Sequence, residues 1–311
     1  MLKEKLLSLI GPLFVAHGVA AGDLIFGLLI GDLLAVLSWA FICSPIATKF
    51  RYTLYYMLEK ICGIKLTAVY NTVNALMFCF LAGSMIAVSA TAVGIPFHLG
   101  MPSLNQWLPN SFEWVIIVLL VGIVTTLVAM FGYNQVSKFA NIAAPWMILV
   151  FIAAAVAVLP DLGVTSLSNF WEVAKTKIWT GKALPGQSQF TFWHVLFFAW
   201  FVNMAMHIGM ADLSILRYAK KWYHGFSPAS GMYVGHFIAW IASGILYALF
   251  LQETSNSMQF APGPIAFRAA GMAGAICVIV AGWTTANPTI YRAGLALQAI
   301  KPKWKTWKVT A

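Results

Sequence analysis

Runs of about 18 or more apolar residues recur along this chain, and they limit the folds open to it more than any other feature. Inside a bilayer the backbone N–H and C=O groups have no water to bond, so runs of this length are satisfied as helices. Hydrophobic residues make up 61% of the sequence and charged residues only 9%, which excludes an ordinary soluble domain. The chain is therefore predicted to be an all-α, polytopic membrane protein.

The apolar runs between charged or turn-rich breaks predict about eight helical segments. A long polar connection from Asp161 to Phe190 indicates a surface loop. The stretches "RYTLYYMLEK" (51–60) and "LRYAKKWYHG" (216–225) carry the aromatic and basic residues of interfacial segments. Residues 1–311 are predicted to form one transmembrane domain, whose segments cover residues 6–20, 24–47, 66–93, 114–132, 140–159, 191–211, 228–252 and 266–300.

The formal net charge of +10 comes from basic residues in the short connections between apolar runs, which is typical of topology signals rather than of a nucleic-acid surface. With the N-terminus in the cytoplasm, most Lys and Arg residues fall on the inner side of the membrane. The distribution predicts a multi-pass protein of the inner (plasma) membrane, surrounded by lipid, with no nucleic-acid partner and no obligate protein partner. The basic residues on the outer side are Lys175, Lys177, Lys182 and Arg268.

Polar residues and helix breakers inside apolar runs are expensive in a bilayer, so they indicate functional sites. In "AHGVAAGD" (16–23) two glycines loosen a helix just before Asp23. In "FVNMAMHIGMAD" (201–212) the residues Asn203 and His207 lie in one apolar run with a glycine, a pattern expected where a helix unwinds around a substrate. Paired glycine-interrupted helices are the best sequence indication of a transporter's binding site, so Asn203 and His207 are predicted to contact substrate.

The stretch "GWTTANPTIYRAG" (282–294) is the third such place. The hydroxyl groups of Thr284 and Thr285, with a backbone carbonyl such as that of Ala281, could bind a small hard cation. Pro288 has no N–H to donate to the preceding turn, which leaves a carbonyl there free. The alternative interpretation is that both threonines bond to carbonyls of their own helix and that Pro288 only kinks it.

Asp32 lies inside the second apolar segment, where a carboxylate is costly unless it is protonated or paired. Two interpretations stay open at this stage. Asp32 could carry a proton during a transport cycle, or it could lie near a polar end of its helix.

Several of these stretches together resemble the nucleobase:cation symporter family, the cytosine/purine, allantoin and hydantoin permeases. "GWTTANPTIYRAGLALQ" (282–298) is similar to the family's eighth helix, in which a W-T-T-N-like run precedes an aromatic residue and "AGL". "GLLIGDLLAVLSW" (27–39) resembles its second helix, and "ADLSILRYAKK" (211–221) resembles its D-x-x-R-Y segment. The resemblance extends over most of the chain and matches the order of helices 2 to 8.

The resemblance implies a leucine-transporter-like fold, in which two inverted five-helix repeats bind substrate and cation near the membrane centre. Against that pattern the chain looks incomplete, because the first half of helix 1 and the helices from the ninth onward have no counterpart. The family's Asn after the Thr pair is Ala286 here, with Asn287 one place later, and Asn287 is predicted to contact substrate. The helix-3 Gln and Trp that hold the base are not visible in "NTVNALMFCFLAGS" (71–84), so their predicted substitutes are Phe78, Trp200 and Phe201.

These observations predict a secondary active transporter, not an enzyme, that couples uptake of a nucleobase or related small heterocycle to a cation. The predicted coupling ion is Na⁺, at Ala281, Thr284 and Thr285, or H⁺, and no other cofactor is expected. One alternative is a non-transporting remnant or sensor with the same fold. A membrane-embedded enzyme is disfavoured, because the sequence has no HExxH motif, no metal-spaced His/Cys set and no paired intramembrane carboxylates around a nucleophile.

Overall fold

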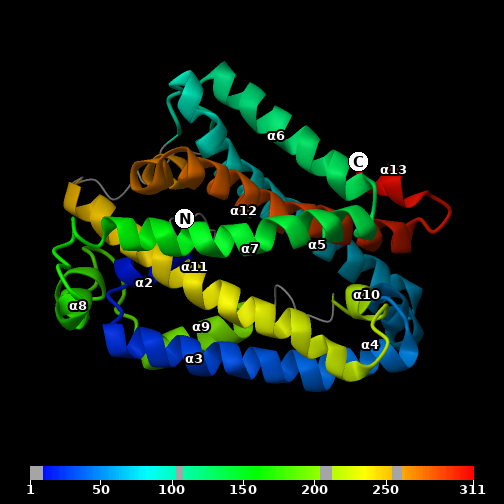
Figure 1. Ribbon diagram of the computed structural model, residues 1–311. Helices are drawn as coiled ribbons and strands as arrows, with labels where there is room; N and C mark the ends of the chain where they lie inside the picture. The colour runs from blue at the N-terminus through cyan, green and yellow to red at the C-terminus, as the bar shows by residue number, and fades with distance from the viewer. Residues whose placement is uncertain (1–9, 103–107, 204–211, 254–260) are drawn as a thin grey trace. The chain divides into compact units, whose positions relative to one another are not determined.

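The computed structural model describes residues 10–102, 108–203, 212–253 and 261–311, and these residues form helices joined by short connections (Figure 1). The described residues form no β-sheet, and their β-type pairing is limited to an isolated bridge between Ala20 and Thr180. The predicted all-α class is thereby confirmed. The predicted substrate residue His207 lies outside the described residues.

Alternating stretches of sequence build two compact units, which we name the α3 unit and the α12 unit. The α3 unit comprises Ile10–Ile64 and Leu159–Ala248, and the α12 unit includes Lys65–Val158 and Leu249–Ala311. Two long helices, α5 (Leu54–Val93) and α11 (Phe226–Glu253), run from one unit into the other.

The remaining helices each belong to one unit. Those of the α3 unit are α2 (Ile10–Ala16), α3 (Ala21–Ser38), η1 (Trp39–Cys43), α4 (Ser44–Phe50), α8 (Leu167–Val173), η3 (Ala174–Ile178), α9 (Phe192–Asn203), α10 (Leu213–Leu216) and η5 (Trp222–Gly225). Those of the α12 unit are η2 (Ile95–Phe97), α6 (Phe112–Met130), α7 (Tyr133–Val158), α12 (Pro262–Ile300) and α13 (Thr306–Thr310).

Six of the described helical segments are long and apolar enough to cross a membrane: Ala21–Phe50, Leu54–Val93, Phe112–Met130, Asn134–Val158, Trp222–Glu253 and Pro262–Ile300. The predicted segments at 6–20 and 191–211 correspond in the described residues to the shorter helices α2, of 7 residues, and α9, of 12 residues. The multi-pass character is therefore supported, whereas the predicted count of eight segments is not confirmed.

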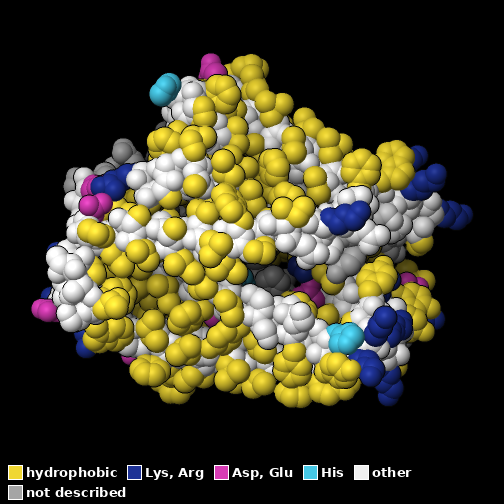
Figure 2. Space-filling view, viewed as in Figure 1, with side chains coloured by type: hydrophobic (Ala, Val, Ile, Leu, Met, Phe, Trp, Pro, Cys, Tyr) yellow, Lys and Arg dark blue, Asp and Glu magenta, His cyan; other side chains and the backbone are white. Residues whose placement is uncertain are grey.

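Many large apolar side chains lie on the surface of the protein, as expected for helices that contact lipid. Figure 2 shows hydrophobic side chains over the visible surfaces of α3 and α6. The exposed apolar residues on these two helices include Phe26, Ile30, Leu33, Leu119, Leu120 and Ile123. Exposed apolar surface on this scale is compatible with helices that contact lipid.

The stretch at 51–60, predicted as an interfacial segment, is largely helical. From Leu54 it is the first part of α5, but the backbone at Gly63 is non-helical, with φ 74° and ψ 167°, so two helices joined by a kink make up α5. The residues that follow Leu54 favour helix, and glycine accepts the left-handed backbone at the bend. The basic and aromatic residues therefore form a short helix of their own before the kink, separate from the apolar helix that follows.

In the α3 unit, α3 packs along α9 with the two backbones in close approach (Figure 1). A Cβ atom at Gly31 would lie 2.5 Å from the carbonyl oxygen of Leu196 and 2.8 Å from Cβ of Ala199. One at Gly27 would lie 2.7 Å from Cβ of Val195. Small residues at such a contact allow membrane helices to gain dispersion energy and exclude lipid from between them.

The helical path breaks between α2 and α3, and the connection between α7 and α9 closes over the break. Gly18 has φ 60°, and a Cβ atom there would lie 2.1 Å from the amide nitrogen of Ala183. The amide of Leu184 donates to the carbonyl of Ala16 at 2.9 Å. The predicted surface loop thus satisfies backbone groups that the end of α2 leaves free.

His17 anchors the same connection. Its ring is only 2% exposed and stacks on the ring of Phe190, with centroids 4.0 Å apart. Its Nδ1 lies 2.7 Å from the carbonyl oxygen of Ser188. A buried imidazole with a backbone partner and a stacked ring stabilises the closed connection.

The basic stretches at 51–60 and 216–225 meet at the other end of the α3 unit. The Arg51 guanidinium donates to the carbonyl of Arg217 at 2.6 Å and to the carbonyl of Ala219. Ser44 Oγ donates to the carbonyl of Trp222 at 2.5 Å. This contact places both stretches at one end of the unit, as their predicted position on the inner side of the membrane requires.

In the α12 unit, α12 packs against α6, α7 and α13 and bonds to α5. Ser89 Oγ donates to the carbonyl of Ile279 at 3.0 Å, and the amide of Gly263 donates to Thr91 Oγ1 at 2.9 Å. Trp283 packs on an apolar cluster from α5 and α6 that includes Trp114. These contacts place the Thr-Thr stretch of α12 inside the unit.

Candidate functional site

The predicted cation ligands lie together on α12. Thr284 Oγ1 donates to the carbonyl of Ala281 at 2.9 Å, and Thr285 Oγ1 donates to the same carbonyl at 3.3 Å. Three oxygen atoms therefore meet within one turn, which is the grouping that the sequence predicts. Their bonding in this structure is that of threonines back-bonded to their own helix, the alternative interpretation. Thr284 Oγ1 also lies 3.8 Å from Sδ of Met147 on α7.

Asn287 lies one turn further along α12 and is 1% exposed. Neither its Oδ1 nor its Nδ2 has a hydrogen-bond partner among the described residues. A buried amide without partners costs about 1–3 kcal/mol per unsatisfied group. An amide in this state is suited to binding a ligand that offers both a donor and an acceptor.

Asn203 is the last residue of α9. The packing of α9 on α3 buries its side chain completely, with 0% exposure. Its Nδ2 donates to Oδ1 of Asp32 on α3 at 2.7 Å, and Asp32 is also 0% exposed. The sequence identifies each residue as an unusual intramembrane polar group. It gives no sign that they pair, because 171 positions separate them.

The aromatic residues predicted to stack on substrate are divided between the units. On α9, Trp200 Nε1 donates to Ser38 Oγ at 3.2 Å. The ring of Trp200 stacks on that of Phe201, with centroids 5.1 Å apart and planes 13° apart. Phe201 is 52% exposed, whereas Phe78 on α5 is buried.

The predicted site residues consequently form two groups. Asn203 and Trp200 belong to the α3 unit, and the other group, in the α12 unit, comprises Phe78, Ala281, Thr284, Thr285 and Asn287. Within each group the structure brings polar residues to a buried position. His17 is a buried polar residue that the sequence reasoning treated only as part of a glycine-loosened stretch; its place in an otherwise apolar run is the signal that could have singled it out.

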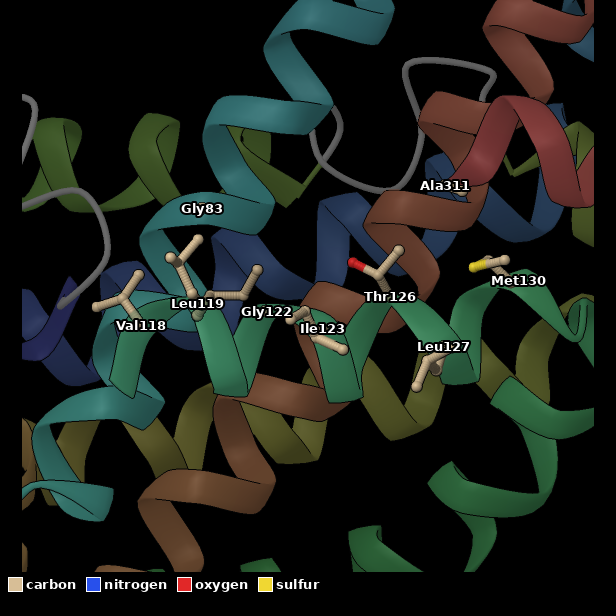
Figure 3. Close-up of a pocket in the computed structure, with 10 residues that line it drawn as sticks. Gly83, Val118, Leu119, Gly122, Ile123, Thr126, Leu127, Met130 and Ala311 are labelled. Carbon is tan, nitrogen blue, oxygen red and sulfur yellow. The ribbon is translucent and has the colours of Figure 1, made fainter. Parts of the chain in front are cut away.

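The α12 unit also carries an open groove of about 420 Å³ along α6 (Figure 3). Val118, Leu119, Ile123 and Leu127 line it, with Thr126 as the only polar side chain among the described lining residues. None of the predicted site residues contributes to it. An apolar groove on a membrane helix suits a lipid chain better than a polar heterocycle.

No grouping of three or more His, Cys, Asp or Glu side chains that could hold a metal ion occurs among the described residues. An alkali cation would rely instead on hydroxyl, carbonyl and amide oxygens of the kind found on α12. No protein-family model matches the chain, and no curated protein matches it significantly.

Proposed function

We propose that this chain is a secondary active transporter that couples uptake of a nucleobase or related small heterocycle to a cation. The observation that carries the proposal is the polar cluster inside α12, an apolar helix of membrane-spanning length. There the Ala281 carbonyl and the hydroxyls of Thr284 and Thr285 lie within hydrogen-bond distance, and Asn287, one turn away, has free amide atoms. Intramembrane polar groups that lack partners are characteristic of substrate and ion pathways.

The chemistry of the predicted site favours a flat, polar ring. Trp200 and Phe201 offer aromatic faces, which attract flat rings by stacking. In the α12 unit, taken separately, Asn287 has an amide whose donor and acceptor are both free, and such a pair matches the edge of a nucleobase, hydantoin or allantoin. A sugar lacks the aromatic faces that these residues would bind, and a charged amino acid would need opposite charges at the site.

Cation coupling gives such a transporter its driving force. Each positive charge that moves inward releases about 2.3 kcal/mol per 100 mV of membrane potential, which can drive accumulation of a neutral solute. The break between α2 and α3 supports a leucine-transporter-like mechanism, because transporters of that kind bind substrate beside interrupted helices. In this proposal Na⁺ binds at Ala281, Thr284 and Thr285.

The test measures heterocycle binding to the purified chain with and without sodium. If the two hydroxyls are ligands, Thr284→Val and Thr285→Val keep the side-chain shape and each remove one oxygen. The sodium effect on affinity, expected to be about 5–150-fold in a coupled site, should then shrink. Thr284→Ser and Thr285→Ser retain the oxygen and should preserve the effect.

Thr125→Val is the matched control, because Thr125 is a buried threonine on α6 whose hydroxyl donates to the carbonyl of Val121 at 2.7 Å. It should leave the sodium ratio unchanged. An unchanged ratio in both Val variants of α12 would show that Thr284 and Thr285 are only back-bonded helix residues. Heterocycle binding without uptake into proteoliposomes would favour a sensor over a transporter.

A further inference from the structure

The buried pair of Asp32 and Asn203 has the composition of a proton site. Asp32 Oδ1 accepts from Asn203 Nδ2 at 2.7 Å. Asp32 Oδ2 and Asn203 Oδ1 have no hydrogen-bond partner among the described residues, and both residues are completely buried. Both of these oxygens are acceptors while the carboxyl is ionised, so neither can satisfy the other.

The helices around Asp32 carry no cation that could balance a carboxylate. Neither α3, α9 nor α11, which bonds to α3 through Tyr233, contains Lys or Arg. The short η3, which also contacts α3, carries two lysines, but Lys177 donates to the carbonyl of Leu162 and Lys175 lies over the ring of Trp171. The other titratable groups on these helices from Asp23 to Tyr247 are Asp23, His194, Tyr233, His236 and Tyr247. Only the two imidazoles among them can become cations, and among the described residues Asp32 hydrogen-bonds to Asn203 and not to either imidazole. An ionised Asp32 would then be an unpaired charge at membrane depth, which is one of the most costly states for a side chain.

One added proton would give both unsatisfied oxygens of the pair a hydrogen-bond partner. Protonated on Oδ2, Asp32 can donate to Asn203 Oδ1 while its Oδ1 continues to accept from Asn203 Nδ2. The result is a cyclic acid–amide pair with two hydrogen bonds and no net charge. The two free oxygens lie on adjoining carboxyl and amide groups, so a single proton between them satisfies both.

We infer that the Asp32–Asn203 pair binds a proton and is a second cation-binding site of this protein, separate in sequence from the threonine cluster of α12. Its role in coupling rests on the proposed transport function, whereas proton binding itself does not. In the cycle, the proton leaves Asp32 Oδ2 for water when the α3–α9 contact opens, and it returns from water on the other side. No bond other than the O–H bond forms or breaks.

Infrared spectroscopy of the purified full chain in lipid tests the inference directly, because a protonated carboxyl has a carbonyl absorption distinct from that of a carboxylate. We expect wild type to show this band at neutral pH and Asp32→Asn to lose it. Asp23→Asn is the matched control: Asp23 is a half-buried carboxyl on the same helix that accepts from the amide of Phe192, and the band should persist.

Asn203→Ala supplies a second measurement that does not depend on Asp32→Asn folding. It leaves Asp32 in place but removes its partner, so the carbonyl band should shift to higher frequency. A band unchanged in both Asp32→Asn and Asn203→Ala would overturn the inference. If the band is lost in Asp32→Asn while no heterocycle binds, the proton site stands and the transport proposal fails; heterocycle uptake with an unchanged band gives the reverse result.

Discussion

Gly31 sets the distance between α3 and α9, because a Cβ atom there would lie 2.5 Å from the carbonyl oxygen of Leu196. A backbone oxygen cannot rotate away as a side chain can, so Gly31→Ala must push the two helices apart. We expect overpacking of this kind to destabilise the protein by about 1–3 kcal/mol. Thermal unfolding in detergent micelles should show a lower midpoint.

Gly22 provides the control for that substitution. It lies on the same helix, and a Cβ atom there would meet no atom within 4 Å. Gly22→Ala should be neutral or stabilise α3 by up to about 1 kcal/mol, because alanine has the higher helix propensity. Equal unfolding midpoints for the two variants would contradict the close-packing explanation.

The sequence alone predicts some of the contacts between individual polar residues. The grouping of Ala281, Thr284 and Thr285 could be predicted because all three lie within 4 positions on one helix. The bond between Asp32 and Asn203 could not, because it depends on how α3 and α9 align after folding. Apolar patterning identifies which residues are unusual, but it does not specify which distant residue each one meets.

The break between α2 and α3 is the element on which the neighbouring connection depends. Gly18 has φ 60° and touches the backbone of Lys182 and Ala183. In Gly18→Ala, a left-handed residue with a Cβ costs about 1–2 kcal/mol, and steric overlap adds to this. The connection should detach more often, so trypsin should cleave after Lys182 faster than in wild type.

Gly186→Ala separates backbone strain from close contact. Gly186 has φ 78° in the same connection, but no atom lies within 4 Å of its Cβ position. Its substitution should change cleavage after Lys182 less than Gly18→Ala does. If Gly186→Ala has the larger effect, the connection is held by its own turn and not by the contact with Gly18.

Element positions follow from apolar runs more reliably than element ends do. The predicted segments at 114–132 and 228–252 agree closely with α6 and α11. The predicted segment at 66–93 also agrees with the part of α5 that follows the kink at Gly63. Apolar patterning does not reveal that another short helix, beginning at Leu54, directly precedes that kink.

At the scale of the whole molecule, the distribution of basic residues predicts opposite sides of the membrane for the two ends of the α3 unit. We expect the cysteine introduced by Lys182→Cys to react with a membrane-impermeant thiol reagent in intact cells. The cysteine introduced by Lys221→Cys should react only after the cells are permeabilised. Each variant is made in a protein whose native cysteines have been replaced, and its labelling is then measured. The native cysteines are Cys43, Cys62, Cys79 and Cys277.

Permeabilised cells give the control, because both variants should then react to a similar extent. Labelling of both positions in intact cells would contradict the predicted orientation. It would also require an even number of crossings between the two sites, whereas the predicted segment at 191–211 supplies a single crossing.

The separation of 171 residues between Asp32 and Asn203 also has a consequence for biosynthesis. At about 5–20 residues per second of translation, Asp32 leaves the ribosome roughly 10–30 s before Asn203 does. During that interval α3 has entered the membrane without the partner helix that would bury its polar face. Asp32 must therefore either remain with the insertion machinery or enter the lipid as a neutral acid, and a nascent chain stalled before residue 203 would reveal which.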